Sequence, residues 1–185
     1  MSIGAAIREA RLARGQTQQV LAKSLFVSDS LLSSWETGKQ KLPREMRRPL
    51  AEKLDNPRLY MELANELCGG VMAPAYLDGP AVDLHRASVR DKAIEELSEA
   101  IEALSKARAL VNARSAEHLK DLDRQQIRNC LNELAEAQTS IGMMIAVICE
   151  TYGVSPGDVY RQHRQELAAK GYIARAKEKS AQKRR

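Results

Sequence analysis

The sequence predicts an all-α protein, and three observations support this prediction. Only 4% of the 185 residues are aromatic. Ala, Leu, Glu, Arg and Gln, which favour helix over sheet in this combination, are abundant. Apolar residues recur at spacings of three and four along most of the chain, which is the period of an amphipathic helix. With 44% hydrophobic and 29% charged residues, the composition is that of a globular protein.

Five short helices are expected at the beginning of the chain. The first starts at Ile3 and ends at Gly15. Thr17 and Ser28 are good N-caps for the second and the third helix, because their side chains can accept hydrogen bonds from free backbone amides. Gly38 is placed to end the third helix.

Pro43 suits the first turn of the fourth helix, and Asn56 with Pro57 opens the fifth. Gly69 and Gly70 end it. The residues expected to face inward from the second helix to the fifth are Val20, Leu21, Leu25, Leu32, Trp35, Met46, Leu50, Leu54, Leu59, Leu63 and Leu67. Five helices in so short a stretch predict a compact bundle.

Longer helices are expected after a linker rich in Gly and Pro, which Tyr76 and Leu77 anchor. One apolar repeat consists of Ile94, Leu97, Ile101, Leu104 and Val111, and a second of Ile127, Cys130, Leu134, Ala137, Ile141, Met144 and Ile148. Joined near residues 112–119, the two predict an antiparallel helical hairpin. A shorter helix follows from about Pro156 to Ala169. The expected division is a bundle at 1–68, a linker at 69–84, a helical domain at 85–173 and a basic disordered tail at 174–185.

The net charge of +5 is unevenly distributed. Residues 1–72 hold 11 basic and 8 acidic residues, giving +3, and residues 73–160 hold 9 and 14, giving −5. Residues 161–185 hold 9 and 2, giving +7. The tail is expected to be a solvated terminus, with a DNA-contacting arm as the alternative.

Several classes of protein are not expected. No apolar run is long enough for a membrane span, and charged residues interrupt any signal core at the N-terminus. The three cysteines, Cys68, Cys130 and Cys149, form no disulfide framework, which favours a reducing cytoplasm. The spacing of His85, His118 and His163 from one another and from the cysteines does not match that of zinc ligands. No metal, no cofactor and no catalytic residue is expected, and the acidic helix face with Glu95, Glu96, Glu99 and Glu102 is interpreted as solvated.

One motif indicates a function. Arg8 and Arg11 precede the block TQQVLAKSL, from Thr17 to Leu25, and the block VSDSLLSSWETGK, from Val27 to Lys39. In type and spacing these blocks resemble the DNA-binding domain of Cro/λ-repressor-type (XRE-like) helix-turn-helix regulators. The resemblance covers about residues 3–68 and implies a five-helix λ-repressor-like bundle that binds double-stranded DNA through its third helix. The C-terminal half carries no such resemblance.

The resemblance also implies roles for particular residues. With Leu32 and Trp35 facing inward, the third helix leaves short polar side chains for the major groove. The implied base-reading residues are Ser28, Asp29, Ser30, Ser33 and Ser34. The implied phosphate contacts are Gln18, Lys39, Lys41 and Arg44, beside helix N-termini. Arg11 and Glu36 occupy the positions of a structural ion pair.

Two residues depart from the family pattern. Phe26 stands in the turn, where the family usually has Gly, so it must either accept a strained backbone or form a different turn. Asp29 stands where many relatives carry Arg, Gln or Asn. Its carboxylate can accept from cytosine N4, but it repels phosphate, so it either adjusts specificity or points away.

The helical domain at 85–173 is expected to form a homodimer. Its expected interface residues are Ile127, Leu134, Ile141, Ile145 and Ile148. The expected function is that of a cytoplasmic, nucleoid-associated transcriptional regulator, a repressor that binds an inverted repeat as a dimer. The alternative is an antitoxin-like or phage or plasmid interaction protein whose C-terminal helices bind a protein partner.

Overall fold

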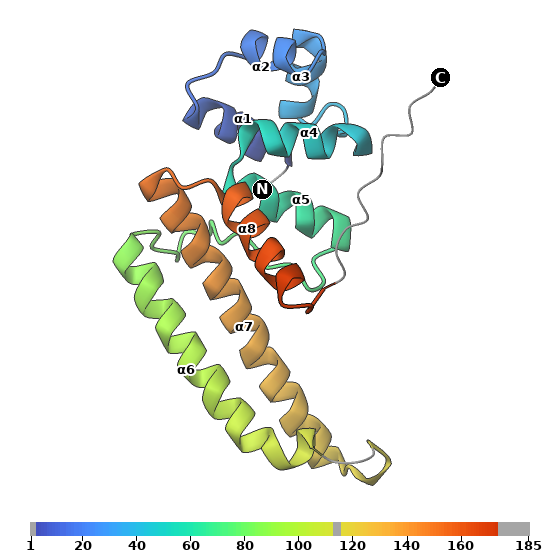
Figure 1. Ribbon diagram of the computed structural model, residues 1–185, viewed down its shortest axis with the longest axis vertical. Helices are drawn as coiled ribbons and strands as arrows, with labels where there is room; N and C mark the ends of the chain where they lie inside the picture. The colour runs from blue at the N-terminus through green and yellow to red at the C-terminus, as the bar shows by residue number, and fades with distance from the viewer. Residues whose placement is uncertain (1–2, 113–115, 174–185) are drawn as a thin grey trace.

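The computed structural model describes residues 3–112 and 116–173 (Figure 1). This part of the chain is helical without any strand, so the all-α prediction is confirmed. The helices are α1 (Ile3–Ala13), α2 (Gln18–Ser24), α3 (Asp29–Glu36), α4 (Arg44–Leu54), α5 (Pro57–Cys68), α6 (Arg86–Val111), α7 (Asp121–Tyr152) and α8 (Pro156–Ala169), with a short 3₁₀ segment, η1 (Ala116–His118), before α7. Residues 113–115 of the expected hairpin connection, and the predicted tail at 174–185, lie outside the described residues.

Side-chain caps begin several of these helices, as the sequence predicts. The Thr17 hydroxyl accepts a hydrogen bond from the Val20 amide at 3.2 Å, and the Asn56 side chain accepts one from the Leu59 amide at 2.9 Å. Each satisfies an amide that has no partner within its helix. Pro43 is the N-cap residue of α4 rather than part of its first turn, because the helix begins at Arg44.

The first five helices enclose one hydrophobic core. Its largest fully buried side chains, each exposed by at most 1%, are Ile7, Leu21, Leu32, Leu50, Leu54 and Leu59. Two residues expected to face inward do not. Val20 is 54% exposed, because the core face of the short α2 is formed by Leu21 and Ala22. Leu67 is 66% exposed, because the last turn of α5 extends past the core. Leu63, one turn earlier, still packs against the core.

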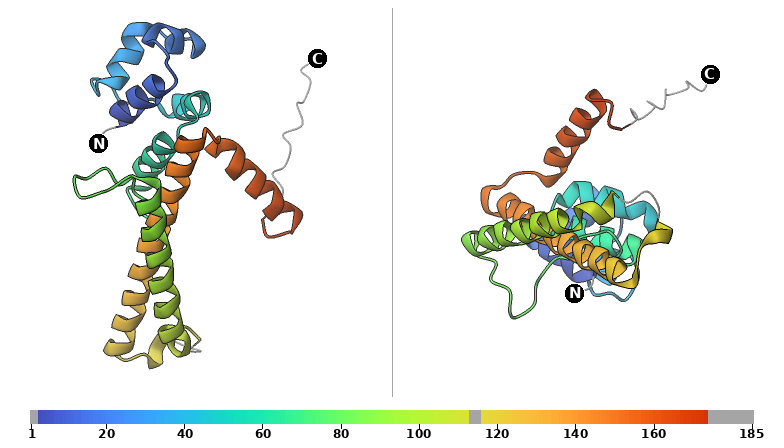
Figure 2. Two further views of the ribbon diagram at one scale, coloured as in Figure 1. Left: turned by 90° about the vertical axis from the view of Figure 1, so that its left-hand side faces the viewer. Right: turned by 90° about the horizontal axis from the view of Figure 1, so that it is seen from below.

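Helices α6 and α7 run side by side along most of their length as an antiparallel hairpin (Figures 1 and 2). On α6, Ala93, Ala100 and Ala107 are buried at intervals of seven residues. These small side chains form an alanine seam against α7, where Cys130 and Ala137 are buried. A seam of small residues lets two helix backbones approach closely.

The large aliphatic residues that predicted α6 do not face α7. Ile94 and Ile101 are 56% and 64% exposed, and Leu97 and Leu104 are 40% and 43% exposed. This aliphatic stripe (Ile94, Leu97, Ile101 and Leu104) lies beside the alanine seam and is left open to solvent. A stripe of this kind on a long helix needs a partner to bury it.

The bundle and the hairpin meet through α5 and the end of α7. Val89, Met143 and Val147 form a small buried cluster there, against which Met61 and Tyr76 pack. Residues 69–84 contain no helix and cross this junction, as expected of a linker.

Polar contacts also join the two parts. The Asp55 carboxylate accepts hydrogen bonds from the Gly157 amide at 3.1 Å and from the Tyr60 hydroxyl at 3.2 Å. Burial and the nearby Asp55 raise the pKa of Tyr60 to about 12, so the phenol stays protonated as a donor. Beyond this contact α8 projects away from the hairpin (Figure 2). None of the described helices combines the length and the apolar character needed to cross a membrane.

Candidate nucleic-acid interface

Helices α2 and α3 lie at the end of the molecule opposite the hairpin tip (Figure 1). Leu32 and Trp35 anchor α3 in the core, with 0% and 2% exposure. The sequence assigns base reading to Ser28 and Asp29 at the start of α3 and to Ser30, Ser33 and Ser34, which lie on the sides of α3 away from the core. Of these, Ser28, Asp29 and Ser30 are exposed, and Ser33 and Ser34 are partly exposed.

The hydroxyl groups on this helix have local partners. The Ser28 hydroxyl caps α3 by accepting from the Leu31 amide at 3.2 Å, and the Ser34 hydroxyl donates to the Ser30 carbonyl at 2.8 Å. Because the Ser34 hydroxyl donates its proton to this carbonyl, its oxygen can still accept a hydrogen bond from another donor. The face is thus short, polar and anchored by buried residues, which suits close approach to base edges.

The turn between α2 and α3 is closed by Phe26. This residue has φ of 58°, the left-handed conformation, and its side chain is 96% exposed. The Val27 amide donates to the Ala22 carbonyl at 3.0 Å across the turn. Phe26 therefore accepts a strained backbone instead of forming a different turn. The conformational strain costs roughly 1–2 kcal/mol relative to glycine.

Arg11 and Glu36 join α1 to the end of α3. The Arg11 Nε and Nη2 atoms donate to the two carboxylate oxygens of Glu36 at 2.7 and 2.9 Å. The two side chains are 7% and 1% exposed. Burial acts to raise the pKa of Glu36, but hydrogen bonds from Arg11 and Gln18 outweigh it, so the pKa lies below its ordinary value. Paired charges in this fork geometry fix the orientation of the two helices.

The predicted phosphate contacts fall into two groups. Lys39, Lys41 and Arg44 are exposed in the loop before α4 and at its first residue, and none forms an ion pair with the described residues. Gln18 differs, because its side-chain amide donates to Glu36 at 2.8 Å. Its contact to phosphate stays a prediction, and the structure gives this side chain a second role in holding Glu36.

Gly4 is a residue that the sequence analysis missed. A Cβ atom at this position would lie 2.3 Å from the Trp35 carbonyl oxygen and 2.7 Å from that of Glu36. Because these are backbone atoms, α1 can pack against the end of α3 only without a side chain here. The sequence did contain a signal for this close contact, namely a glycine inside a predicted helix, one turn before the inward-facing Ile7.

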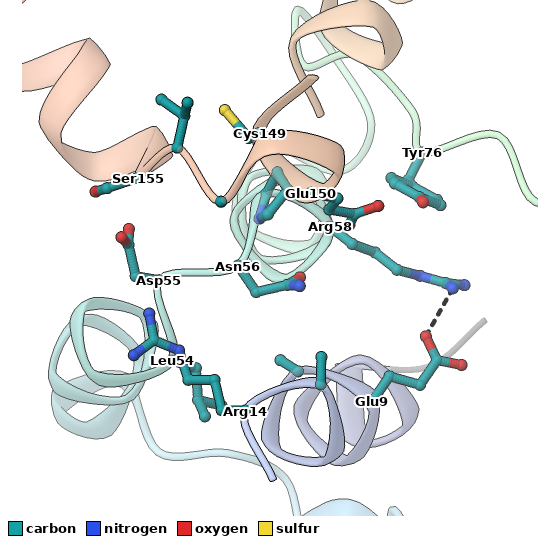
Figure 3. A pocket seen from close by; sticks show the side chains of 15 residues that line it. Glu9, Arg14, Leu54, Asp55, Asn56, Arg58, Tyr76, Cys149, Glu150 and Ser155 are labelled. Carbon is teal, nitrogen blue, oxygen red and sulfur yellow. Dashed lines mark hydrogen bonds and ion pairs between the residues drawn. The ribbon is translucent and has the colours of Figure 1, made fainter. Parts of the chain in front are cut away.

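Arg58 was missed as well. Its guanidinium donates to Glu9 of α1 at 2.7 Å and to Asp78 of the linker at 2.6 Å, and it lies over the Tyr76 ring. It borders a pocket of about 570 Å³ between the bundle and the end of α7, shown in Figure 3. Glu150 also lines this pocket, and burial raises its pKa.

The predicted dimer residues lie along one helix, α7. Ile141 and Ile148 are exposed, and Ile127, Leu134 and Ile145 are partly exposed. Leu134, Ile141 and Ile145 line an apolar groove of about 420 Å³ together with Leu97, Ile101 and Leu104 of α6. Ile127 and Ile148 do not line it. The sequence therefore identified the α7 side of this groove and missed the α6 side.

Comparison with known proteins identifies the N-terminal part. Residues 2–57 match the model of a family described as a helix-turn-helix domain. No curated protein and no solved structure matches the chain. The N-terminal part is therefore a helix-turn-helix domain, consistent with the XRE-like resemblance, and the match does not reach the hairpin. A domain of this class suggests a DNA-binding regulator.

Proposed function

We propose that this protein is a sequence-specific transcriptional regulator that represses by occupying promoter DNA. The observation that carries the proposal is the exposed polar face of α3, anchored by Leu32 and Trp35 and flanked by the free cations Lys39, Lys41 and Arg44. A helix that reads bases beside side chains that hold phosphates is the division of labour expected for specific binding. The proposed role is binding rather than catalysis, in the cytoplasm and on the nucleoid.

The distribution of charge supports this orientation on DNA. Residues 73–160, which hold the hairpin, carry −5, whereas residues 1–72 carry +3. The hairpin extends away from the end of the molecule where α2 and α3 lie (Figure 1). An acidic body that points away from the duplex avoids repulsion by its phosphates, so the bundle can dock with the hairpin in solvent.

The proposal includes a homodimer formed through the hairpin. The apolar groove and the aliphatic stripe of α6 form one face that the described residues leave uncovered. A second copy would bury this face about a two-fold axis, where each hairpin presents the same surface to the other. Two helix-turn-helix domains related by a two-fold axis match an inverted repeat with half-sites about 34–36 Å apart.

One observation favours the alternative of a protein partner. A second hollow, of about 320 Å³, is lined by Met61 and Ala64 of α5 and by Tyr160 of α8. It shares Pro74, Gly142, Ile145 and Tyr160 with the apolar groove, so the two adjoin. An apolar channel of this kind suits an amphipathic helix of another protein, as in antitoxin-like proteins.

Selection of DNA from a random pool with the full-length protein tests the proposal. The expected result is an inverted repeat whose half-site spacing matches one helical turn, together with a dimer by light scattering without DNA. An enriched single half-site with a monomer in solution would overturn the homodimer. Failure to enrich any sequence would overturn specific DNA binding.

A further inference from the structure

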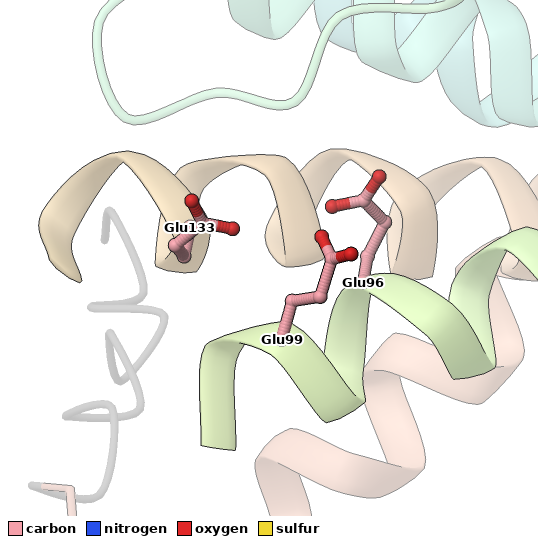
Figure 4. A group of neighbouring side chains, drawn as sticks. All are labelled: Glu96, Glu99 and Glu133. Carbon is pink, nitrogen blue, oxygen red and sulfur yellow. The ribbon is translucent and has the colours of Figure 1, made fainter. Parts of the chain in front are cut away.

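Three carboxylates from two helices meet between α6 and α7. Glu96 and Glu99 are one turn apart on α6, and Glu133 faces them from α7 (Figure 4). One carboxylate oxygen of each lies within 4.8 Å of the other two. Neither Glu99 nor Glu133 forms an ion pair with any described residue. The structure thus gathers three acidic groups where the sequence, with 36 residues between Glu96 and Glu133, indicated only a solvated face.

Glu96 is the unusual member of this cluster, because its side chain is only 6% exposed. It lies on the buried face of α6 between Ala93 and Ala100, so a carboxylate interrupts the alanine seam. Its Oε1 oxygen accepts from the exposed Lys92 at 2.8 Å, one turn back along the helix. Its Oε2 oxygen is buried and has no hydrogen-bond partner among the described residues.

A buried carboxylate oxygen without a partner is costly, and the neighbours of Glu96 add to the cost. Figure 4 shows one Glu96 oxygen directed toward Glu99. The protein therefore supplies oxygen ligands and negative charge at this point. The cations beside it already have other partners, because Lys92 pairs with Glu95 and Glu96, and Lys106 pairs with Glu102.

We propose that Glu96, Glu99 and Glu133 bind a hard divalent cation of the Mn²⁺, Mg²⁺ or Ca²⁺ class, which links α6 to α7. An oxygen-only ligand set selects this class over zinc or copper. Ligand distances of about 2.1–2.6 Å place opposite oxygens up to about 5 Å apart, so the three oxygens need little movement to share one ion.

The remaining coordination positions are open to water. A hollow of about 430 Å³ is lined by Glu99 and Glu133, by the amide side chains of Gln126 and Asn129, and by the Glu102–Lys106 ion pair. Water molecules in this hollow can complete the coordination shell, since magnesium and manganese sites in proteins usually keep several. The Glu96 oxygen that lacks a partner then has one.

The cation would hold the hairpin together without forming part of the dimer face. Glu99 is on the side of α6 away from the aliphatic stripe, because residues 99 and 101 are about 200° apart on a helix. An ion that binds the folded hairpin but not the unfolded chain stabilises the fold, by an amount that grows with the logarithm of the free ion concentration above the dissociation constant. The site is thus independent of base reading by α3.

Titration of the full-length, chelator-treated protein with Mn²⁺, followed by the loss of the free-ion electron paramagnetic resonance signal, tests the proposal. We expect one saturable site per chain with a dissociation constant on the order of 10⁻⁵ to 10⁻³ M. Ca²⁺ or Mg²⁺ should compete for the site, and saturating Mn²⁺ should raise the midpoint of thermal unfolding.

Variants separate a built site from general attraction to an acidic surface. Glu99→Gln and Glu133→Gln should each weaken Mn²⁺ binding at least tenfold, because each removes a ligand. Glu136→Gln is the matched control, since Glu136 is exposed on the same helix as Glu133 and lies outside the cluster. Circular dichroism checks that the variants fold.

Two results would overturn the proposal. One is the absence of saturable Mn²⁺ binding up to about 10 mM, ten times the weak end of the expected range. The other is equal affinity in Glu133→Gln and Glu136→Gln. Either result would mean that the three carboxylates do not form a built metal site.

Discussion

The guanidinium of Arg11 donates to both carboxylate oxygens of Glu36, and this buried pair joins the first helix of the bundle to the last turn of α3. Arg11 also donates to the Gln16 carbonyl at 2.7 Å, and Gln18 donates to Glu36. The pair therefore organises α1, the loop that follows it, α2 and α3 around one buried salt bridge.

Replacing one partner of this pair should be more harmful than replacing both. Arg11→Met leaves the Glu36 carboxylate buried without its cation, so we expect a loss of about 3 kcal/mol in the free energy of unfolding. Arg11→Met/Glu36→Leu should lose less. Urea unfolding followed by the fluorescence of Trp35, the single tryptophan, measures both. Arg48→Met, which removes an exposed pair with Glu52, is the control and should cost under about 1 kcal/mol.

The same pair predicts an acid limit to stability. The pKa of Glu36 is lower in the folded protein than in the unfolded chain, so its contribution is complete above the unfolded value. It is lost as the pH falls through the lowered value. Between about pH 6 and pH 3, the free energy of unfolding should therefore fall more steeply for the native protein than for Glu36→Gln, which cannot titrate there. Parallel curves would contradict this prediction.

Gly4→Ala should destabilise the bundle even though alanine is the better helix former. The added methyl group would meet the Trp35 and Glu36 carbonyl oxygens, which cannot move without disturbing α3. We expect a loss of about 1–3 kcal/mol, as for overpacking in a core. Thermal unfolding measures it, with Gly79→Ala in the linker as the control, because a Cβ atom there meets nothing within 4 Å. A stabilised Gly4→Ala variant would show that α1 can shift freely.

Base reading and phosphate contact should respond differently to mutation. Ser30→Ala and Ser34→Ala should change which DNA sequence is preferred, whereas Lys41→Ala and Arg44→Ala should weaken binding to all sequences alike. Each lost phosphate contact should reduce the salt slope by about one. Fluorescence anisotropy with selected and random duplexes at several salt concentrations measures both effects. If the serine variants lose the same affinity for selected and for random DNA, Ser30 and Ser34 do not read bases.

The homodimer should depend on the aliphatic stripe of α6. Ile101→Glu places a charge in the groove that a second copy would bury, so we expect the dimer to dissociate and operator affinity to fall at least tenfold. Ala109→Glu adds the same charge to an exposed position on the same helix and should leave the dimer intact. Analytical ultracentrifugation of the two variants provides the comparison. A dimer that survives Ile101→Glu would place the interface elsewhere.

Local signals in the sequence determined the helices and the class of the N-terminal domain. Thr17 and Ser28 cap helices because their hydroxyls satisfy amides only three residues away, and Gly38 follows α3 with positive φ. The helix-turn-helix motif is likewise read within one short stretch of chain. Such features need no knowledge of distant contacts, so the sequence alone is sufficient for them.

Only the tertiary structure decided which faces meet. The period of α6 shows that Ile94 and Ile101 share one face and that Ala93 and Ala100 share the next, but it does not show which of the two packs on α7. In the structure the alanines pack against α7, because their small side chains allow close approach of the backbones. This packing leaves the aliphatic stripe exposed. The same packing buries Glu96, since a carboxylate between two alanines of the seam has to follow them into the interface.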